Sequence, residues 1–113
     1  MAIRLVLSTC STQDEAESLG RQLVEERLAA CATALPGAVS VYWWEGTAVR
    51  QGECLLLLKT TADRVAQLEG RLHELHSYDC PEFLVLDVPA ASGPYAKWVH
   101  ESVGSEHAGI DPA

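Results

Sequence analysis

The longest strand-like pattern in this chain runs from Ala38 to Thr60. It predicts two long β-strands, 38–44 and 48–60, around a turn at Glu45-Gly46-Thr47, because β-branched and aromatic residues favour strands and glycine favours turns. Successive side chains of a strand point to opposite faces of the sheet. The first arm places Val39, Val41 and Trp43 on one face and Tyr42 and Trp44 on the other; the second arm places Leu55 and Leu57 opposite Cys54, Leu56 and Leu58. Both faces are therefore apolar. Helices of a small domain cover one of them, so the second predicts contact with another subunit.

The rest of the chain predicts further strands and three helices. We expect strands at 3–8 and 83–88, the latter buried, and a short extended segment at 29–35 that Pro36-Gly37 interrupts with a turn or bulge. The first helix follows the capping box Thr12-Gln13-Asp14-Glu15, with its apolar residues facing a core and Glu15 on the solvent side. A second helix follows Thr60-Thr61 and ends near His76, and a short third helix starts at Ser92-Gly93-Pro94 with Tyr95, Trp98 and Val99 on its apolar side.

The order of these elements predicts the fold class. Strand, helix, strand, strand, helix, strand and a short helix make an α+β, ferredoxin-like βαββαβ sandwich with a long central β-hairpin and a short C-terminal helix. We expect one domain over residues 1–103 and a disordered tail over 104–113, where the residues are small and polar. This fold serves many unrelated tasks, so it does not fix the function.

Composition and charge narrow the classes of partner. The apolar fraction of 48% and the charged fraction of 21% are typical of a soluble globular protein, and no apolar run approaches the roughly 20 residues of a membrane-spanning helix. The net charge of −8 argues against a nucleic-acid partner, which requires clustered lysine and arginine. The N-terminus enters a strand directly and lacks a signal-peptide pattern, so we expect a cytoplasmic location.

Catalysis is not indicated by any motif. The sequence lacks the G-x-S-x-G and H-E-x-x-H patterns and a phosphate-binding glycine loop. Cys10 lies near a helix start, which can activate a thiol, but no base is visible beside it. The four cysteines form no C-x-x-C pair, and in a reducing compartment we expect free thiols. We therefore expect neither an enzyme nor an organic cofactor.

Several passages, in order and at matching spacing, are similar to the CutA family of divalent-cation tolerance proteins. They are Glu26-Arg27-Leu28-Ala29-Ala30-Cys31 before Pro36-Gly37, then Tyr42-Trp43-Trp44-Glu45-Gly46, then Leu57-Leu58-Lys59-Thr60, and then the run 74–82, ELHSYDCPE. The resemblance extends from about Ile3 to Val103. It implies a ferredoxin-like homotrimer whose sheets pack edge to edge and face to face about a three-fold axis. It also implies a role in tolerance to divalent metals, copper especially.

The resemblance also suggests metal ligands. The family's copper-associated cysteine corresponds to Ser8 here, and Cys10 would replace it if the loop bends it back. The family's histidine before the tyrosine corresponds to His76. Cys31 is a further candidate, because imidazole and thiolate suit copper and zinc. The alternative is that His76 only stabilises the end of its helix by interacting with the helix dipole, and that Cys31 is a thiol packed among apolar residues.

A second group suggests a different kind of site. The resemblance places Lys59, Tyr78 and Glu82 with His76 in a cleft between subunits, where the similarly shaped nitrogen-signalling trimers bind small effectors. An amine, a phenol and a carboxylate could fix an anionic or zwitterionic ligand; otherwise they are interface hydrogen bonds. We expect the exposed aromatics to be interface anchors rather than ligand platforms: Tyr42, Trp43 and Trp44.

Two functions thus remain open at this stage. The first is a cytoplasmic homotrimer that responds to divalent metal ions and binds copper or a similar cation, without membrane or nucleic-acid partners. The second is a trimeric signalling or small-molecule-binding module that uses the clefts between its subunits.

Overall fold

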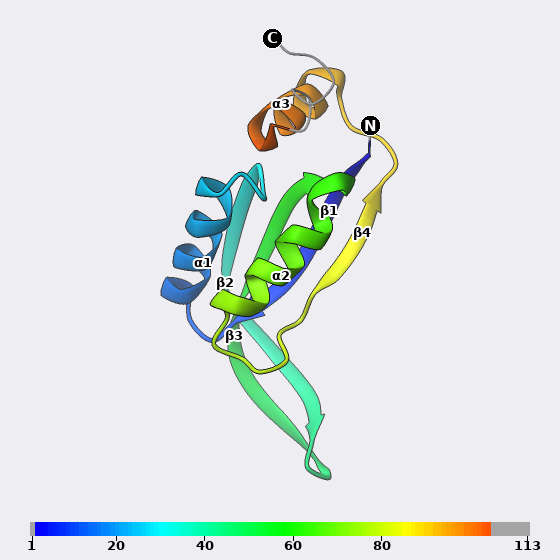
Figure 1. The fold of residues 1–113 in the computed structure, drawn as a ribbon. Helices are drawn as coiled ribbons and strands as arrows, with labels where there is room; N and C mark the ends of the chain where they lie inside the picture. Colours follow the sequence, from blue (N-terminus) through cyan, green and yellow to red (C-terminus); the bar gives the residue numbers. More distant parts are fainter. Residues whose placement is uncertain (1, 105–113) are drawn as a thin grey trace.

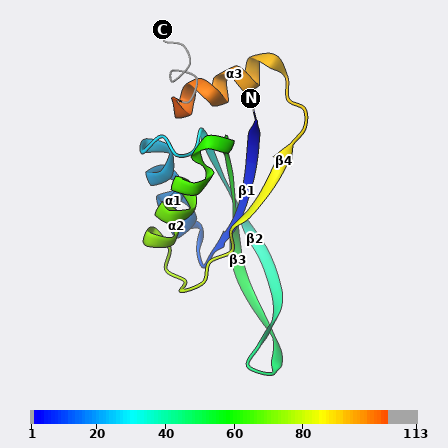
Figure 2. The same cartoon turned by 45° about the vertical axis from the view of Figure 1, so that its right-hand side comes forward.

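A computed structural model describes residues 2–104 of the chain (Figure 1). The elements follow in the order β1 (Ile3–Cys10), α1 (Gln13–Glu25), β2 (Cys31–Trp44), β3 (Thr47–Thr61), the 3-10 helix η1 (Ala62–Arg64), α2 (Val65–Leu75), β4 (Leu84–Val88) and α3 (Gly93–Val103). The strands form an antiparallel sheet in the order β2-β3-β1-β4. Helices α1 and α2 cover the same face of this sheet (Figure 2). The predicted ferredoxin-like α+β fold is confirmed.

The core lies between this sheet and the two helices. Alternate residues of the central strands point into it, because β1 and β3 are paired in register and their side chains alternate between faces. The helices contribute apolar residues at three- and four-residue spacing. The fully buried side chains include Val6, Leu56 and Leu58 from the sheet and Leu23, Leu68 and Leu72 from the helices.

The opposite face of the sheet is apolar and open along much of its length. Leu7 pairs with Leu57 on β3 and with Leu84 on β4, and Leu5 pairs with Leu86. The prediction of a second apolar face is therefore confirmed. The prediction that the last strand is buried is wrong for the single chain: β4 is an edge strand, and Leu84 and Leu86 are 54% and 43% exposed.

The hairpin formed by β2 and β3 projects beyond the helical layer (Figures 1 and 2). A register shift between Leu35 and Ala38 confirms the predicted bulge, and Gly37 adopts a positive φ of 85° there. Trp44 pairs with Thr47, so the turn has two residues, Glu45 and Gly46, rather than three. Both have positive φ, as in a type I′ hairpin turn, whose twist matches that of the flanking strands.

Two element boundaries differ from the sequence prediction. Strand β1 continues to Cys10, beyond the predicted end at residue 8, because β3 pairs with it as far as Cys54. Helix α2 is preceded by η1, with Thr61 at the N-cap position of that 3-10 helix.

Helix α3 starts after Ser92, as predicted, but of the three residues expected on its buried side only Val99 is buried. Val99 and Val103 are buried against Ile3, whereas Tyr95 and Trp98 remain partly exposed. Gly104 closes this helix in the left-handed conformation that favours glycine. The rest of the predicted tail, 105–113, lies outside the described residues.

Candidate metal site

Three potential metal ligands meet at one end of the sandwich. Cys10 ends β1 and points to the helical face, Glu15 lies in the first turn of α1, and His76 is the C-cap residue of α2. Their ligand atoms all lie within 4.8 Å of one another. The fold produces this meeting, because β1 runs into α1 at the end of the sheet where α2 finishes.

The contacts of His76 define its tautomer. The backbone N–H of Tyr78 donates to Nδ1 at 3.0 Å, so Nδ1 carries no proton. Nε2 lies 2.8 Å from the carbonyl oxygen of Thr9, which can only accept, so Nε2 carries the proton and donates it. Cys10 Sγ lies 3.7 Å from the same Nε2. His76 is thus a buried imidazole with hydrogen-bond partners at both ring nitrogens.

Glu15 ties the start of α1 to the loop after α2. Its carboxylate accepts from the backbone N–H and the hydroxyl of Ser11 and from the backbone N–H of Ser77, at 2.9–3.1 Å. Partial burial raises the pKa of this carboxyl, but the hydrogen bonds from Ser77 and Ser11 outweigh burial and lower the pKa to about 2. Oε2 lies 3.8 Å from His76 Nδ1. A fixed negative charge therefore lies beside the imidazole.

The thiol of Cys10 is protonated at neutral pH. Burial, with the nearby Glu15 carboxylate as a second cause, raises its pKa to about 12. A metal ligated by this sulfur must therefore displace a proton.

Tyr78 connects this cluster to the hairpin. Its ring packs against the His76 ring at a centroid distance of 4.7 Å, and its hydroxyl donates to Glu53 Oε2 at 2.8 Å. Gln51 donates its amide N–H to the Tyr78 hydroxyl at 3.3 Å and accepts from the Tyr42 hydroxyl at 2.6 Å. Burial and then the hydrogen bond with Glu53 raise the pKa of Tyr78 well above its usual value, so the phenol stays protonated.

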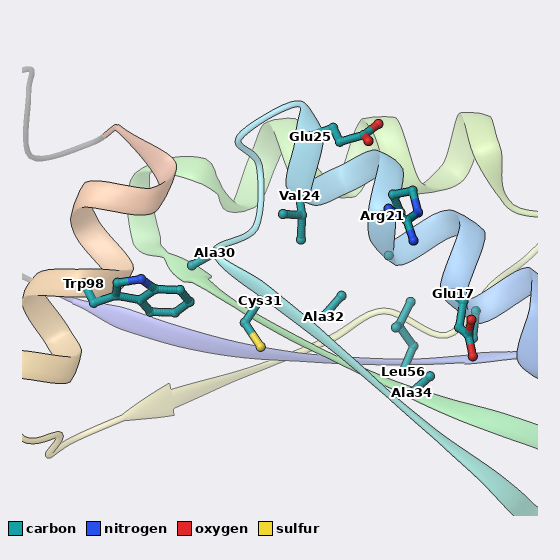
Figure 3. Close-up of a pocket in the computed structure, with 12 residues that line it drawn as sticks. Glu17, Arg21, Val24, Glu25, Ala30, Cys31, Ala32, Ala34, Leu56 and Trp98 are labelled. Carbon is teal, nitrogen blue, oxygen red and sulfur yellow. The ribbon is translucent and has the colours of Figure 1, made fainter.

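The sequence predicted Cys10 and His76 as ligands, and the structure brings them together. It places Cys31 elsewhere, on β2, where Sγ lies 4.0 Å from Lys59 Nζ and 3.8 Å from the hydroxyl of Thr33. Cys31 lines a groove of about 550 Å³ between α1 and the edge strand β2, with Trp98 at one end (Figure 3).

The predicted cleft residues do not gather within one chain. Lys59 lies 5.9 Å from the ring centroid of Tyr95, Tyr78 bonds to Glu53 on β3, and Glu82 precedes β4. A cleft between subunits thus stays a prediction. The predicted interface aromatics lie on the projecting hairpin, where all three are exposed, Trp43 most of all at 74%: Tyr42, Trp43 and Trp44.

Sequence reasoning missed Glu15, which was assigned to the solvent side of its helix. The capping box correctly placed Glu15 in the first turn, with its N–H bonded to the Thr12 hydroxyl. The predicted topology could have indicated the role of Glu15, because it brings the end of β1, the first turn of α1 and the end of α2 together.

Comparisons with known proteins agree with this arrangement. Residues 4–102 match the family model described as CutA1 divalent ion tolerance protein. This chain belongs to the CutA1 family. Its curated CutA relative from Thermus thermophilus, named a divalent-cation tolerance protein, is 39% identical over 88% of this chain and 97% of the relative. The predicted family resemblance is thereby confirmed.

Solved CutA structures confirm the fold. The crystal structure of CutA from Xylella fastidiosa superimposes with a TM-score of 0.87 at 42% identity, covering 89% of this chain and 97% of that one. The Archaeoglobus fulgidus structure, described as a periplasmic divalent cation tolerance protein CutA, gives a TM-score of 0.87 at 27% identity, covering 89% and 98%. Within residues 2–104 of this CutA chain, no helix has both the length and the apolar character needed to cross a bilayer.

Proposed function

We propose that this CutA chain acts in divalent-metal tolerance by holding copper, or a cation of similar preference, at Cys10, Glu15 and His76. One observation carries the proposal: a thiol, a carboxylate and an imidazole from three separate elements have ligand atoms within 4.8 Å of one another. Structural packing alone does not require that donor combination. A mixed sulfur, nitrogen and oxygen set is the kind that transition metals prefer.

The donor set fits such an ion in type and in spacing. Thiolate and imidazole select copper and zinc over magnesium and calcium, which prefer oxygen ligands. Ligands bound at about 2.3 Å (sulfur) and 2.05 Å (nitrogen) lie about 3.6 Å apart at a tetrahedral angle. Cys10 Sγ and His76 Nε2 are separated by 3.7 Å. An ion bound there would be neutralised by the thiolate and by Glu15, and its uptake would release the thiol proton.

The assembly proposed with this site is a homotrimer. Its support is the apolar face of the sheet, the exposed hairpin aromatics and the two free sheet edges, β2 and β4. An isolated soluble domain rarely leaves such surfaces uncovered. Sedimentation at micromolar concentration should give a mass near three chains, and a stable lone subunit would refute the trimer.

A cytoplasmic location and a non-catalytic role complete the proposal. The structure has free thiols at all four cysteines, which suits a reducing compartment. The Cys10 thiol lies beside His76, as a nucleophile beside a base would. Its pKa of about 12 nevertheless makes it a poor nucleophile at neutral pH.

Calorimetric titration with Cu(II) and Zn(II) tests the metal site directly. We expect His76→Ala and Cys10→Ser each to weaken binding at least about tenfold, since even residues that only support a ligand cost 10–100-fold. His73→Ala is the matched control, because His73 is exposed one turn earlier on α2, with Nδ1 against the carbonyl oxygen of Glu69. Equal affinities for all four proteins, or no binding below millimolar concentration, would eliminate this site.

The small-molecule alternative is favoured by one observation. Lys59 lies beside the ring of Tyr95, which contacts the Trp98 ring in a tilted arrangement, and Trp98 lines the groove of about 550 Å³. A metal-independent thermal shift with a metabolite, lost in Lys59→Ala, would support this second function.

A further inference from the structure

His76 cannot ligate a metal and keep its present hydrogen bonds. Both ring nitrogens are engaged: Nδ1 accepts from the Tyr78 N–H, and Nε2–H donates to the Thr9 carbonyl. A metal-ligating imidazole is neutral, with a lone pair on one nitrogen for the ion and a proton on the other. Either choice of nitrogen changes what the ring offers to Tyr78.

The two choices lead to the same loss. If Nδ1 is the ligand, its lone pair is used and the Tyr78 N–H has no acceptor. If Nε2 is the ligand, its proton must leave, and the neutral ring then carries a proton on Nδ1. That N–H faces the Tyr78 N–H as donor against donor, and it lies 3.8 Å from Glu15 Oε2, a carboxylate that can accept it. The ring's proton count is unchanged in both cases.

We propose that occupancy of the Cys10–Glu15–His76 site releases Tyr78 and, through its hydroxyl, loosens the hairpin. An N–H that loses its acceptor away from water costs free energy, so the loop that follows α2 must rearrange to satisfy it. The Tyr78 hydroxyl is bonded to Glu53 and Gln51 on β3, and Gln51 holds the Tyr42 hydroxyl on β2. Movement of Tyr78 therefore acts on both arms of the hairpin. This inference rests on the proposed metal function and adds its coupling to a second region.

The coupling must be reciprocal. If the metal loosens the contact of Tyr78 with the hairpin, then that contact opposes the metal by the same factor. Tyr78→Phe keeps the backbone N–H and the ring against His76 but removes the hydroxyl that binds β3. We expect Tyr78→Phe to bind Zn²⁺ about fivefold more tightly than the wild type, at the lower end of typical coupling.

The direct test is amide hydrogen exchange by NMR on the assembled, ¹⁵N-labelled protein with and without saturating Zn²⁺, which is diamagnetic and redox-inert. Mg²⁺ serves as the control ion, because it avoids sulfur and nitrogen ligands. We expect Zn²⁺ to speed exchange at Tyr78 at least about tenfold and to speed exchange across Val39–Trp44. In Tyr78→Phe, Zn²⁺ should still speed hydrogen exchange at the backbone amide of residue 78, but it should not speed exchange in the hairpin.

The possible outcomes distinguish a failure of this coupling from a failure of the proposed metal site. Zinc bound by calorimetry with an unchanged Tyr78 amide overturns the inference and leaves the metal site standing. A response at Tyr78 without one at the hairpin overturns the relay. An equal or weaker affinity in Tyr78→Phe also overturns it. Absence of zinc binding removes the metal function, and the inference with it.

Discussion

The Glu15 carboxylate should make the stability of this protein fall steeply in acid. Its pKa is lowered from an ordinary 4.5 to about 2 in the folded chain, as hydrogen bonds from Ser77 and Ser11 outweigh burial. A group whose folded pKa is lowered stabilises the fold fully above its unfolded pKa. That contribution is lost as the pH falls from about 4.5 through about 2.

The size of the effect follows from the two pKa values. At about 1.36 kcal/mol per pH unit between them, the carboxylate contributes up to about 3 kcal/mol at neutral pH. Its side chain remains 19% exposed, so water screens part of this and we expect about 2 kcal/mol. Glu15→Gln should therefore lower the free energy of unfolding by about 2 kcal/mol at pH 7, because the amide accepts more weakly than the carboxylate.

The assay is urea denaturation of both proteins from pH 7 to pH 2, with a chelator present and at one protomer concentration. The difference between the two should shrink below pH 4.5 and largely vanish near pH 2, where Glu15 gains its proton. Glu17→Gln is the matched control, an exposed carboxylate on the same helix bonded to Gln13, and should change stability by less than about 0.5 kcal/mol. A gap between wild type and Glu15→Gln that stays constant from pH 7 to pH 2 would refute the reasoning.

Three further predictions concern packing and reactivity. Ser8 is fully buried and its hydroxyl has no hydrogen-bond partner among the described residues, so Ser8→Ala should raise the free energy of unfolding by about 1 kcal/mol, seen as a higher melting temperature. Gly20→Ala would place a Cβ 2.7 Å from an alanine Cβ on β2 and should lower the free energy of unfolding by about 1–3 kcal/mol. Gly70 lies on α2 with open space around it, so Gly70→Ala should raise the free energy of unfolding by about 0.5–1 kcal/mol. Urea denaturation of both variants measures these changes. Cys10, buried and with a pKa of about 12, should react with iodoacetamide far more slowly than exposed Cys80, which peptide mass spectrometry of a time course will show.

The order of elements was predictable because local signals agreed with the global fold. The capping box located the start of α1, and alternation located both arms of the hairpin. Pro36-Gly37 located the bulge, where Gly37 takes up a positive φ. Each signal depends on residues close in sequence, and so it can be read without knowing the fold.

Two features could not be obtained in that way. The apolar run of β4 resembles a buried strand, but its burial depends on what covers the sheet, which a single sequence does not state. Glu15 resembles a solvated helix residue, and its bond to Ser77 joins segments 62 residues apart. Cys10 and His76 were proposed from residue type and family position, and only the three-dimensional contact shows that they share one neighbourhood.

The bulge at Pro36-Gly37 has a consequence for how this molecule can change. It adds one residue to β2 between the segment over the helices and the segment that projects. Residues paired across the two strands share a face of the sheet, so the sides on which Val41 and Tyr42 emerge are set by their partners Arg50 and Val49 on β3. The extra residue is absorbed at the bulge and does not shift the pairing nearer the turn. A one-residue insertion or deletion at this point can therefore change the bend of the projecting arm without exchanging its two faces.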